Sequence, residues 1–112
     1  MLHVPKALYP KKFYPSYVSG GGFVMSKNIT DKLFLQSLKT PLIPIDDAFV
    51  GILLSGIGKK PTNSNRFRSW GGEESQKCYW WEAITHHKIT DEKMKTVWQT
   101  YLKQLDECDD LF

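Results

Sequence analysis

Two short segments of this chain combine residue types that restrict how the backbone can fold around them. The first runs from Tyr14 to Ser26 and contains the three consecutive glycines Gly20-Gly21-Gly22. Because glycine has no Cβ, such a run lets the backbone approach a ligand or a neighbouring strand closely. The second is the acidic pair Asp46-Asp47, which stands before an almost wholly apolar stretch. An acidic pair at the start of a helix places carboxylates at the edge of a sheet, where enzymes that act on sugars and nucleotides have their catalytic residues.

Apolar side chains recur at helical spacing in three segments, and they predict helices near 27–39, 47–57 and 91–105. The last segment has the clearest periodicity, carried by Met94, Val97, Trp98, Tyr101, Leu102 and Leu105. We expect Asn28 or Thr30 to cap the first helix, Asp46 or Asp47 to cap the second, and Gly58 to end the second. Short strands are predicted over 21–26 and 79–85, so the expected fold class is α/β.

Length and composition exclude several classes of protein. A chain of 112 residues can form one domain or part of one. The net charge of +3 comes from scattered basic residues, so we expect no nucleic-acid partner. No apolar run is long enough to span a membrane. The two cysteines, Cys78 and Cys108, make one disulfide possible, but their spacing alone does not decide whether it forms.

The order, residue types and spacing of the first two segments resemble the C-terminal half of the β-1,3-glycosyltransferases of family 31. That family includes β-1,3-galactosyl- and N-acetylglucosaminyltransferases, and its pattern reads roughly Y-P-P-Y-x-S-G-x-G-Y-V-x-S, then an acidic residue and Asp-Val-x-x-Gly. The matching residues here are Tyr14 to Ser26 and Asp46 to Gly51. The resemblance extends from about Val4 to Leu102. It implies that residues 1–112 form the acceptor-side, C-terminal portion of a GT-A type domain whose nucleotide-binding half is absent.

The acidic pair has two alternative interpretations. Helix capping explains it without any chemistry, but one capping aspartate suffices, which would leave one carboxylate without a structural role. The resemblance implies that Asp47 is the general base, which accepts the proton of the attacking sugar hydroxyl as UDP leaves the anomeric carbon. It also implies that Asp46, Gly21, Gly22 and Tyr17 lie near the substrates. Backbone geometry is the alternative explanation for the glycines, and core packing for the tyrosine.

Two adjacent histidines follow the strand predicted over 79–85. Relatives carry Val-His at this place, and His87 stands seven residues before Met94, as the family spacing requires. The resemblance therefore implies that His87 helps to hold a divalent cation, Mn²⁺, on the diphosphate of UDP. A His-His pair without other ligands is by itself a weak metal signal, and packing is the alternative. We expect His86 to point to the other face of the strand.

The resemblance leaves part of such an enzyme unaccounted for. No Asp-x-Asp motif, which binds Mn²⁺ and UDP in relatives, occurs in the 112 residues, and neither does a membrane anchor. We therefore expect a fragment of an inverting β-1,3-hexosyltransferase, inactive alone. The parent would move galactose or N-acetylglucosamine from a UDP-sugar donor to a glycan acceptor, on the lumenal side of the Golgi membrane. The alternative is a non-catalytic carbohydrate- or protein-binding remnant that does not bind the donor.

The chain also contains one N-glycosylation sequon, Asn28-Ile29-Thr30. Such a tripeptide accepts an oligosaccharide only in the secretory lumen. Asn28 is therefore a candidate glycosylation site if the chain passes through that compartment.

Overall fold

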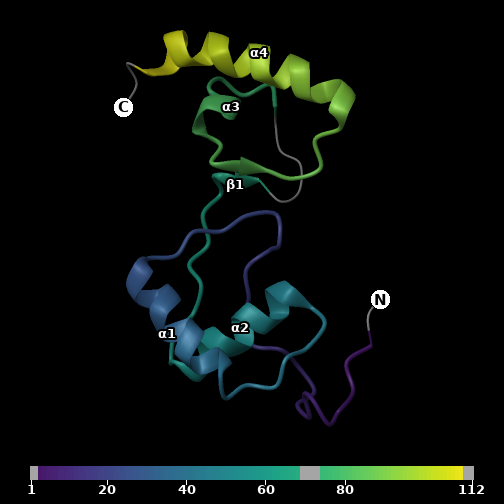
Figure 1. Cartoon of the computed structure of the whole chain (residues 1–112). Coiled ribbons are helices and arrows are strands. Elements are labelled where there is room, and N and C mark those ends of the chain that lie inside the picture. The colour runs from purple at the N-terminus through teal and green to yellow at the C-terminus, as the bar shows by residue number, and fades with distance from the viewer. Residues whose placement is uncertain (1–2, 69–73, 110–112) are drawn as a thin grey trace. The chain divides into compact units, whose positions relative to one another are not determined.

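The computed structural model describes residues 3–68 and 74–109, and the chain divides into two compact units, of which the first ends at Asn63 (Figure 1). The first unit contains α1 (Lys27–Ser37) and α2 (Asp46–Gly56). The second contains β1 (Phe67–Arg68), α3 (Tyr79–Glu82), β2 (Thr85–His86) and α4 (Asp91–Cys108). The strands β1 and β2 pair in parallel. Helices together with this small parallel sheet confirm the mixed α/β class.

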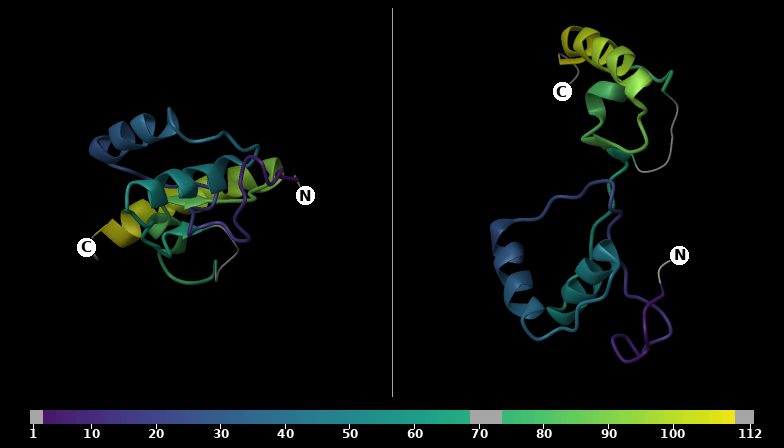
Figure 2. Two further views of the ribbon diagram at one scale, coloured as in Figure 1. Left: turned by 90° about the horizontal axis from the view of Figure 1, so that it is seen from below. Right: turned by 45° about the vertical axis from the view of Figure 1, so that its right-hand side comes forward.

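The core of the first unit lies between α1 and α2, which pack against each other (Figure 2). Its buried centre is made by Leu33 of α1 and by Leu53 and Leu54 of α2. Partly buried side chains surround this centre, namely Met25, Ile29, Phe49, Val50 and Ile57. The helical spacing of these apolar residues is what predicted both helices.

The N-cap of the first helix lies two residues before one predicted cap, Asn28, and four residues before the other, Thr30. Ser26 is the N-cap of α1, and its Oγ accepts the N–H of Ile29 at 3.3 Å. Asn28 and Thr30 are therefore wrong as caps, because both already lie inside the helix. Capping by Ser26 still follows the general rule that a short hydroxyl side chain satisfies a free N–H of the first turn.

The second helix ends as the sequence predicts, at a left-handed glycine. Gly58 has φ of 72°, and its N–H donates to the carbonyl of Ser55 at 3.0 Å. The N–H of Lys59 donates to the carbonyl of Leu54 at 2.9 Å. This pair of bonds is a Schellman motif, which requires a residue that adopts positive φ without strain.

The strand predicted over 21–26 is wrong. Residues 20–21 form a turn, and residues 22–26 are irregular. Ser19 organises the turn, since its Oγ accepts the N–H of Gly21 and its carbonyl accepts the N–H of Gly22, both at 3.3 Å. A strand needs a neighbour that pairs its N–H and C=O groups, and the described residues provide none for this segment.

The strand predicted over 79–85 is also largely wrong, because Tyr79–Glu82 forms the single helical turn α3. Only its end, Thr85–His86, belongs to a strand. Aromatic residues favour strands, but here a side chain of α4 supports a helical turn. The Oε1 of Gln104 accepts the N–H of Trp80 and the N–H of Trp81, each at 2.9 Å. These N–H groups lie in the first turn, where no helical carbonyl can serve them.

A disulfide joins Cys78 to Cys108, with their Cα atoms 5.8 Å apart. It links the residue before α3 to the last residue of α4, and both half-cystines are buried. Thr90 caps the start of α4, since its Oγ1 accepts the N–H of Lys93. The helix therefore begins where it was predicted. It runs three residues beyond the predicted end at 105, and the disulfide holds this last turn against α3.

Among the helices of the described ranges, 3–68 and 74–109, none combines the length and the apolar character that crossing a membrane requires.

Reduction of the disulfide should destabilise the second unit by about 3 to 4 kcal/mol, because a bridge across 30 residues restricts the unfolded chain. Hydrogen exchange followed by mass spectrometry should show loss of protection in α3 and α4 after reduction or in Cys78→Ser. Peptides of α2 serve as the control, since the first unit contains no cysteine. Equal protection of α4 before and after reduction would contradict this expectation.

Candidate functional site

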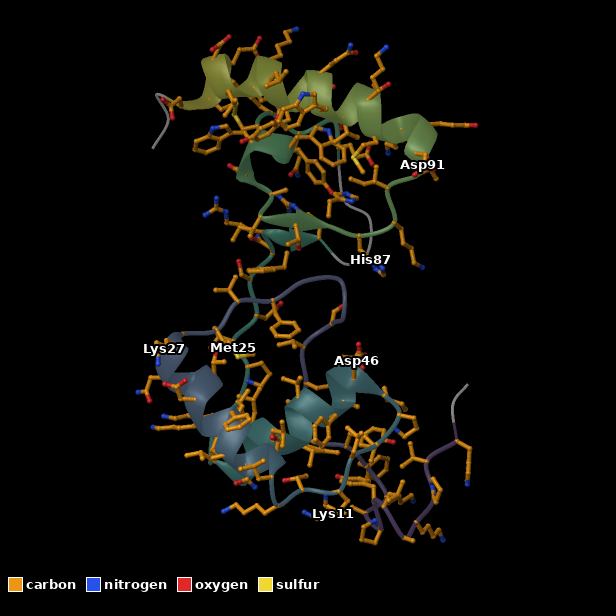
Figure 3. The ribbon with its side chains drawn as sticks, viewed as in Figure 1. Lys11, Met25, Lys27, Asp46, His87 and Asp91 are labelled. Carbon is orange, nitrogen blue, oxygen red and sulfur yellow. A yellow bond between two sulfur atoms is a disulfide. The ribbon has the colours of Figure 1, made fainter. Side chains whose placement is uncertain are left out.

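The acidic pair occupies the first turn of α2 (Figure 3). The Oδ1 of Asp46 accepts the N–H of Asp47 at 2.8 Å, and the Oδ1 of Asp47 accepts the N–H of Ala48 at 2.8 Å. The N-cap of α2 is Ile45, whose side chain cannot accept a hydrogen bond, so the prediction that Asp46 or Asp47 is the cap is wrong. Both carboxylates therefore support the helix start, and the premise that one of them has no structural role is wrong.

The two carboxylates differ in their surroundings. Asp46 is exposed, whereas Asp47 is half-buried. A Cβ built on Gly20 would lie 3.6 Å from the Oδ2 of Asp47, so the glycine-rich segment passes within van der Waals reach of this oxygen. Asp47 is thus anchored through Oδ1 and directs Oδ2 toward a backbone without side chains. A carboxylate held in this way can accept a proton from a hydroxyl group bound beside it.

The approach of the glycine-rich segment to α2 depends on Gly51, which is buried in the middle of the helix. A Cβ built on Gly51 would lie 3.0 Å from the carbonyl oxygen of Ser16 and 3.1 Å from the Cα of Tyr17. No side chain fits there, so glycine is what allows the backbone to cross the helix one turn after Asp47. Sequence reasoning predicted a close backbone approach for the run Gly20-Gly21-Gly22, but it assigned no role to Gly51. A lone glycine inside an apolar helical pattern is the signal that marks such an approach.

Several aromatic residues precede the glycine run in the sequence. Tyr17 is 46% exposed and meets Tyr14 edge to face, with ring centroids 6.4 Å apart. The ring of Tyr9 lies against that of Tyr14, tilted by 36°, with centroids 4.9 Å apart, and the hydroxyl of Tyr9 donates to the carbonyl of Phe13 at 2.7 Å. Burial raises the pKa of Tyr9, and the neighbouring Tyr14 raises it further. The half-buried Gly21 belongs to the turn that continues this segment. The segment therefore carries both aromatic faces and the backbone that reaches Asp47.

In the second unit, His86 points into an aromatic cluster. Its ring centroid lies 4.7 Å from that of Trp80, and its Nε2 lies 3.1 Å from the hydroxyl of Tyr79. Its Nδ1 lies 3.0 Å from the carbonyl oxygen of His87. A carbonyl can only accept, so Nδ1 carries the proton. In the neutral ring, Nε2 therefore accepts the hydroxyl proton of Tyr79.

Both backbone polar groups of His87, the N–H and the carbonyl, form hydrogen bonds. Its N–H donates to the carbonyl of Arg68 at 2.8 Å, and its carbonyl accepts from His86. The side chain is exposed and extends away from α3 and α4 (Figure 3). Within residues 3–68 and 74–109, no three His, Cys, Asp or Glu side chains gather closely enough to hold a metal ion. Since a divalent cation needs several ligands, the described residues do not by themselves form a site for Mn²⁺.

The structure thus places the proposed base and the proposed metal ligand in different units, Asp47 in the first and His87 in the second. Within the first unit it brings Asp47, Gly20, Gly51 and Tyr17 together along one contact between a helix and a loop. Within the second unit it separates the roles of the two histidines, since one ring is enclosed and the other is exposed.

Comparison with known proteins gives consistent matches. The sequence profile of a family described as galactosyltransferase matches residues 2–65. Beta-1,3-galactosyltransferase 1 of Mus musculus is 32% identical over 96 residues, which cover 86% of this chain and 29% of that protein, and the Homo sapiens protein matches equally. UDP-GlcNAc:betaGal beta-1,3-N-acetylglucosaminyltransferase 7 of Rattus norvegicus is 32% identical over 103 residues, covering 86% and 26%. The chain therefore spans less than a third of the length of these relatives. No solved structure matches the chain.

Replacement of Gly51 by alanine should destabilise the first unit by about 1 to 3 kcal/mol, because the new methyl group meets backbone atoms of Ser16 and Tyr17. Gly56→Ala is the matched control on the same helix. Its Cβ meets the Cδ of Gln36 at 2.8 Å, and this flexible side chain can move away. Urea denaturation should show a loss for Gly51→Ala alone. Equal stability of the two variants would mean that the crossing is not tight.

Replacement of Tyr79 by phenylalanine should cost the second unit about 1 kcal/mol, because the half-buried His86 loses the donor to its Nε2. Imidazole ¹H–¹⁵N spectra should show His86 protonated at Nδ1, and its Nε2 signal should shift in Tyr79→Phe. Tyr101→Phe on α4 is the control, with no shift expected. A His86 ring protonated only at Nε2 would overturn the assignment.

Proposed function

Because the chain belongs to the galactosyltransferase family, we propose that it forms the acceptor-side, C-terminal part of an inverting β-1,3-hexosyltransferase domain of the GT-A type. The donor is a UDP-sugar that carries galactose or N-acetylglucosamine, the two sugars named for the relatives, and the acceptor is a glycan. The observation that carries this proposal is the position of Asp47. Its Oδ1 is fixed by the helix start, and its Oδ2 faces the backbone at Gly20.

In this mechanism, Asp47 acts as the general base. Its Oδ2 takes the proton from the 3-hydroxyl of the acceptor sugar while that oxygen attacks the anomeric carbon of the donor. The bond from the anomeric carbon to the diphosphate breaks, and UDP leaves with its electron pair. Attack from the side opposite to UDP inverts the configuration and gives the β linkage.

The neighbouring residues take positioning roles in this proposal. Gly21 and Gly22 continue the backbone that passes Asp47, where the absence of side chains leaves room for a sugar ring. Tyr17 offers an exposed aromatic face for stacking against a sugar. Asp46 holds the N–H of Asp47 and so supports the position of the base.

The proposal includes a manganese ion, for which this chain would supply one ligand, His87. Its imidazole is exposed on a backbone that two hydrogen bonds hold in place. When bound, such a cation neutralises the charge that develops on the leaving diphosphate. The other ligands would have to come from residues other than those described, so no step is assigned to the ion here.

The proposed location is the lumenal side of the Golgi membrane. The disulfide between Cys78 and Cys108 supports a lumenal location, because buried disulfides persist in oxidising compartments and are rare in the cytosol.

A second candidate function is a non-catalytic module that binds a carbohydrate or a protein. It is favoured by one observation, the absence of any cluster of metal ligands among the residues that the structure describes. The two functions differ in whether Asp47 is needed for turnover.

A chimera tests the role of Asp47. The 96 aligned residues of the Mus musculus beta-1,3-galactosyltransferase 1 are replaced by the matching part of this chain, and UDP release from UDP-galactose is measured with a β-linked acceptor. Asp47→Asn should lower turnover by about a hundred- to ten-thousand-fold, because the amide keeps the shape but cannot take the proton. Asp46→Asn is the matched control and should retain most activity, because its amide oxygen can still accept the N–H of Asp47.

The outcomes separate the candidates. Loss of turnover in Asp46→Asn but not in Asp47→Asn would transfer the role of base to Asp46. A chimera that folds and binds UDP yet transfers no sugar would favour the non-catalytic module. The 112-residue chain assayed alone is expected to release no UDP, since its described residues hold no complete metal site.

A further inference from the structure

The sequon lies at the exposed start of α1, on the flank of the helix that does not pack against α2. Asn28 is the second residue of this helix and is exposed. The next residue, Ile29, packs against the core around Leu33, so the two side chains leave the helix in different directions. In the part of the chain that the structure describes, the side chain of Asn28 makes no hydrogen bond. A large substituent on its amide would displace no contact of the fold.

The surface beside Asn28 also has room for such a substituent. Lys32 and Leu35 lie on the same side of α1, one and two turns further on, and both are exposed. The apolar side chain of Leu35 is 63% exposed. A hydrophilic cover at Asn28 would shield it.

The second unit supplies independent evidence on the compartment. Both cysteines of the chain are used in the buried disulfide Cys78–Cys108. A protein that forms such a bond folds in an oxidising compartment, such as the secretory lumen in which oligosaccharides are added to sequons.

We propose that Asn28 carries an N-linked oligosaccharide. The donor is an oligosaccharide bound to a lipid diphosphate. The Nδ2 of Asn28 forms a bond to the C1 of the first sugar while the bond from this C1 to the diphosphate breaks. The lipid diphosphate leaves, and the proton lost from the amide goes to a base of the transferring enzyme. This modification does not depend on the proposed sugar transfer by Asp47.

The geometry of α1 also determines when the sugar is added. A sequon needs the hydroxyl of its third residue together with the amide of its first. In α1 the two residues are two positions apart and do not face each other, and the Oγ1 of Thr30 donates to the carbonyl of Ser26 at 3.0 Å. The folded helix is therefore not a substrate, and the oligosaccharide is added while residues 28–30 are still extended.

Translation of the full chain behind a cleavable secretory signal, with microsomes present, tests the proposal. We expect a slower gel band that a peptide N-glycosidase returns to the unmodified position. Asn28→Gln and Thr30→Ala should remove the slower band. Thr30→Ser, which keeps the hydroxyl, and Asn65→Gln, which lies outside any sequon, should retain it.

A second arm exposes the purified, folded chain to detergent-solubilised microsomal transferase and the lipid-linked donor. We expect no modification here, and modification should appear when the same chain is unfolded. Circular dichroism of Asn28→Gln should match the parent, which shows that the variant folds. Absence of the slower band during translation, or a slower band that persists in Asn28→Gln, would overturn the proposal. Modification of the folded chain would overturn the order of events.

Discussion

The first unit depends on one close approach, that of the Ser16–Tyr17 backbone to Gly51 in the middle of α2. The same helix packs against α1 through Leu53 and Leu54. Because Gly51 has no side chain, the chain can cross the helix and reach its N-terminus, where Gly20 meets the carboxylate of Asp47. The spacing of the acidic pair and the glycine thus has a physical meaning. The glycine sets where the loop crosses, and the carboxylate lies one turn before that point.

The second unit is stabilised differently, by cross-links between short elements. A helix of a single turn does not persist by itself in water, since nucleation is unfavourable. Here α3 is held by the disulfide at its start and by the amide of Gln104, which accepts two of its N–H groups. The aromatic rings of α3 then enclose His86, and His86 in turn fixes the carbonyl of His87. These cross-links stabilise a unit whose hydrophobic core is too small to stabilise it alone.

Local patterns predicted what depends on local interactions. The periodicity of α4, its start at Thr90 and the left-handed end of α2 at Gly58 all follow from neighbours within one or two turns. The errors concern contacts between distant residues. The turn at Tyr79 is helical because Gln104 lies beside it, and 21–26 is not a strand because no partner adjoins it in the described residues. In the candidate site, the role of Asp47 stays a prediction from its motif, and its closeness to Gly20 could not be predicted without the crossing at Gly51.

The contact between Gly51 and Tyr17 can be measured directly by nuclear Overhauser spectroscopy on the isotopically labelled full chain. The structure predicts strong cross-peaks between the Hα protons of Gly51 and the Hα and Hβ protons of Tyr17, since a Cβ at Gly51 would lie 3.1 Å from the Cα of Tyr17. The helical cross-peaks of α2 provide the internal reference. Intact helical cross-peaks without any between Gly51 and Tyr17 would contradict the account, because the glycine-rich segment would then have no fixed path to Asp47.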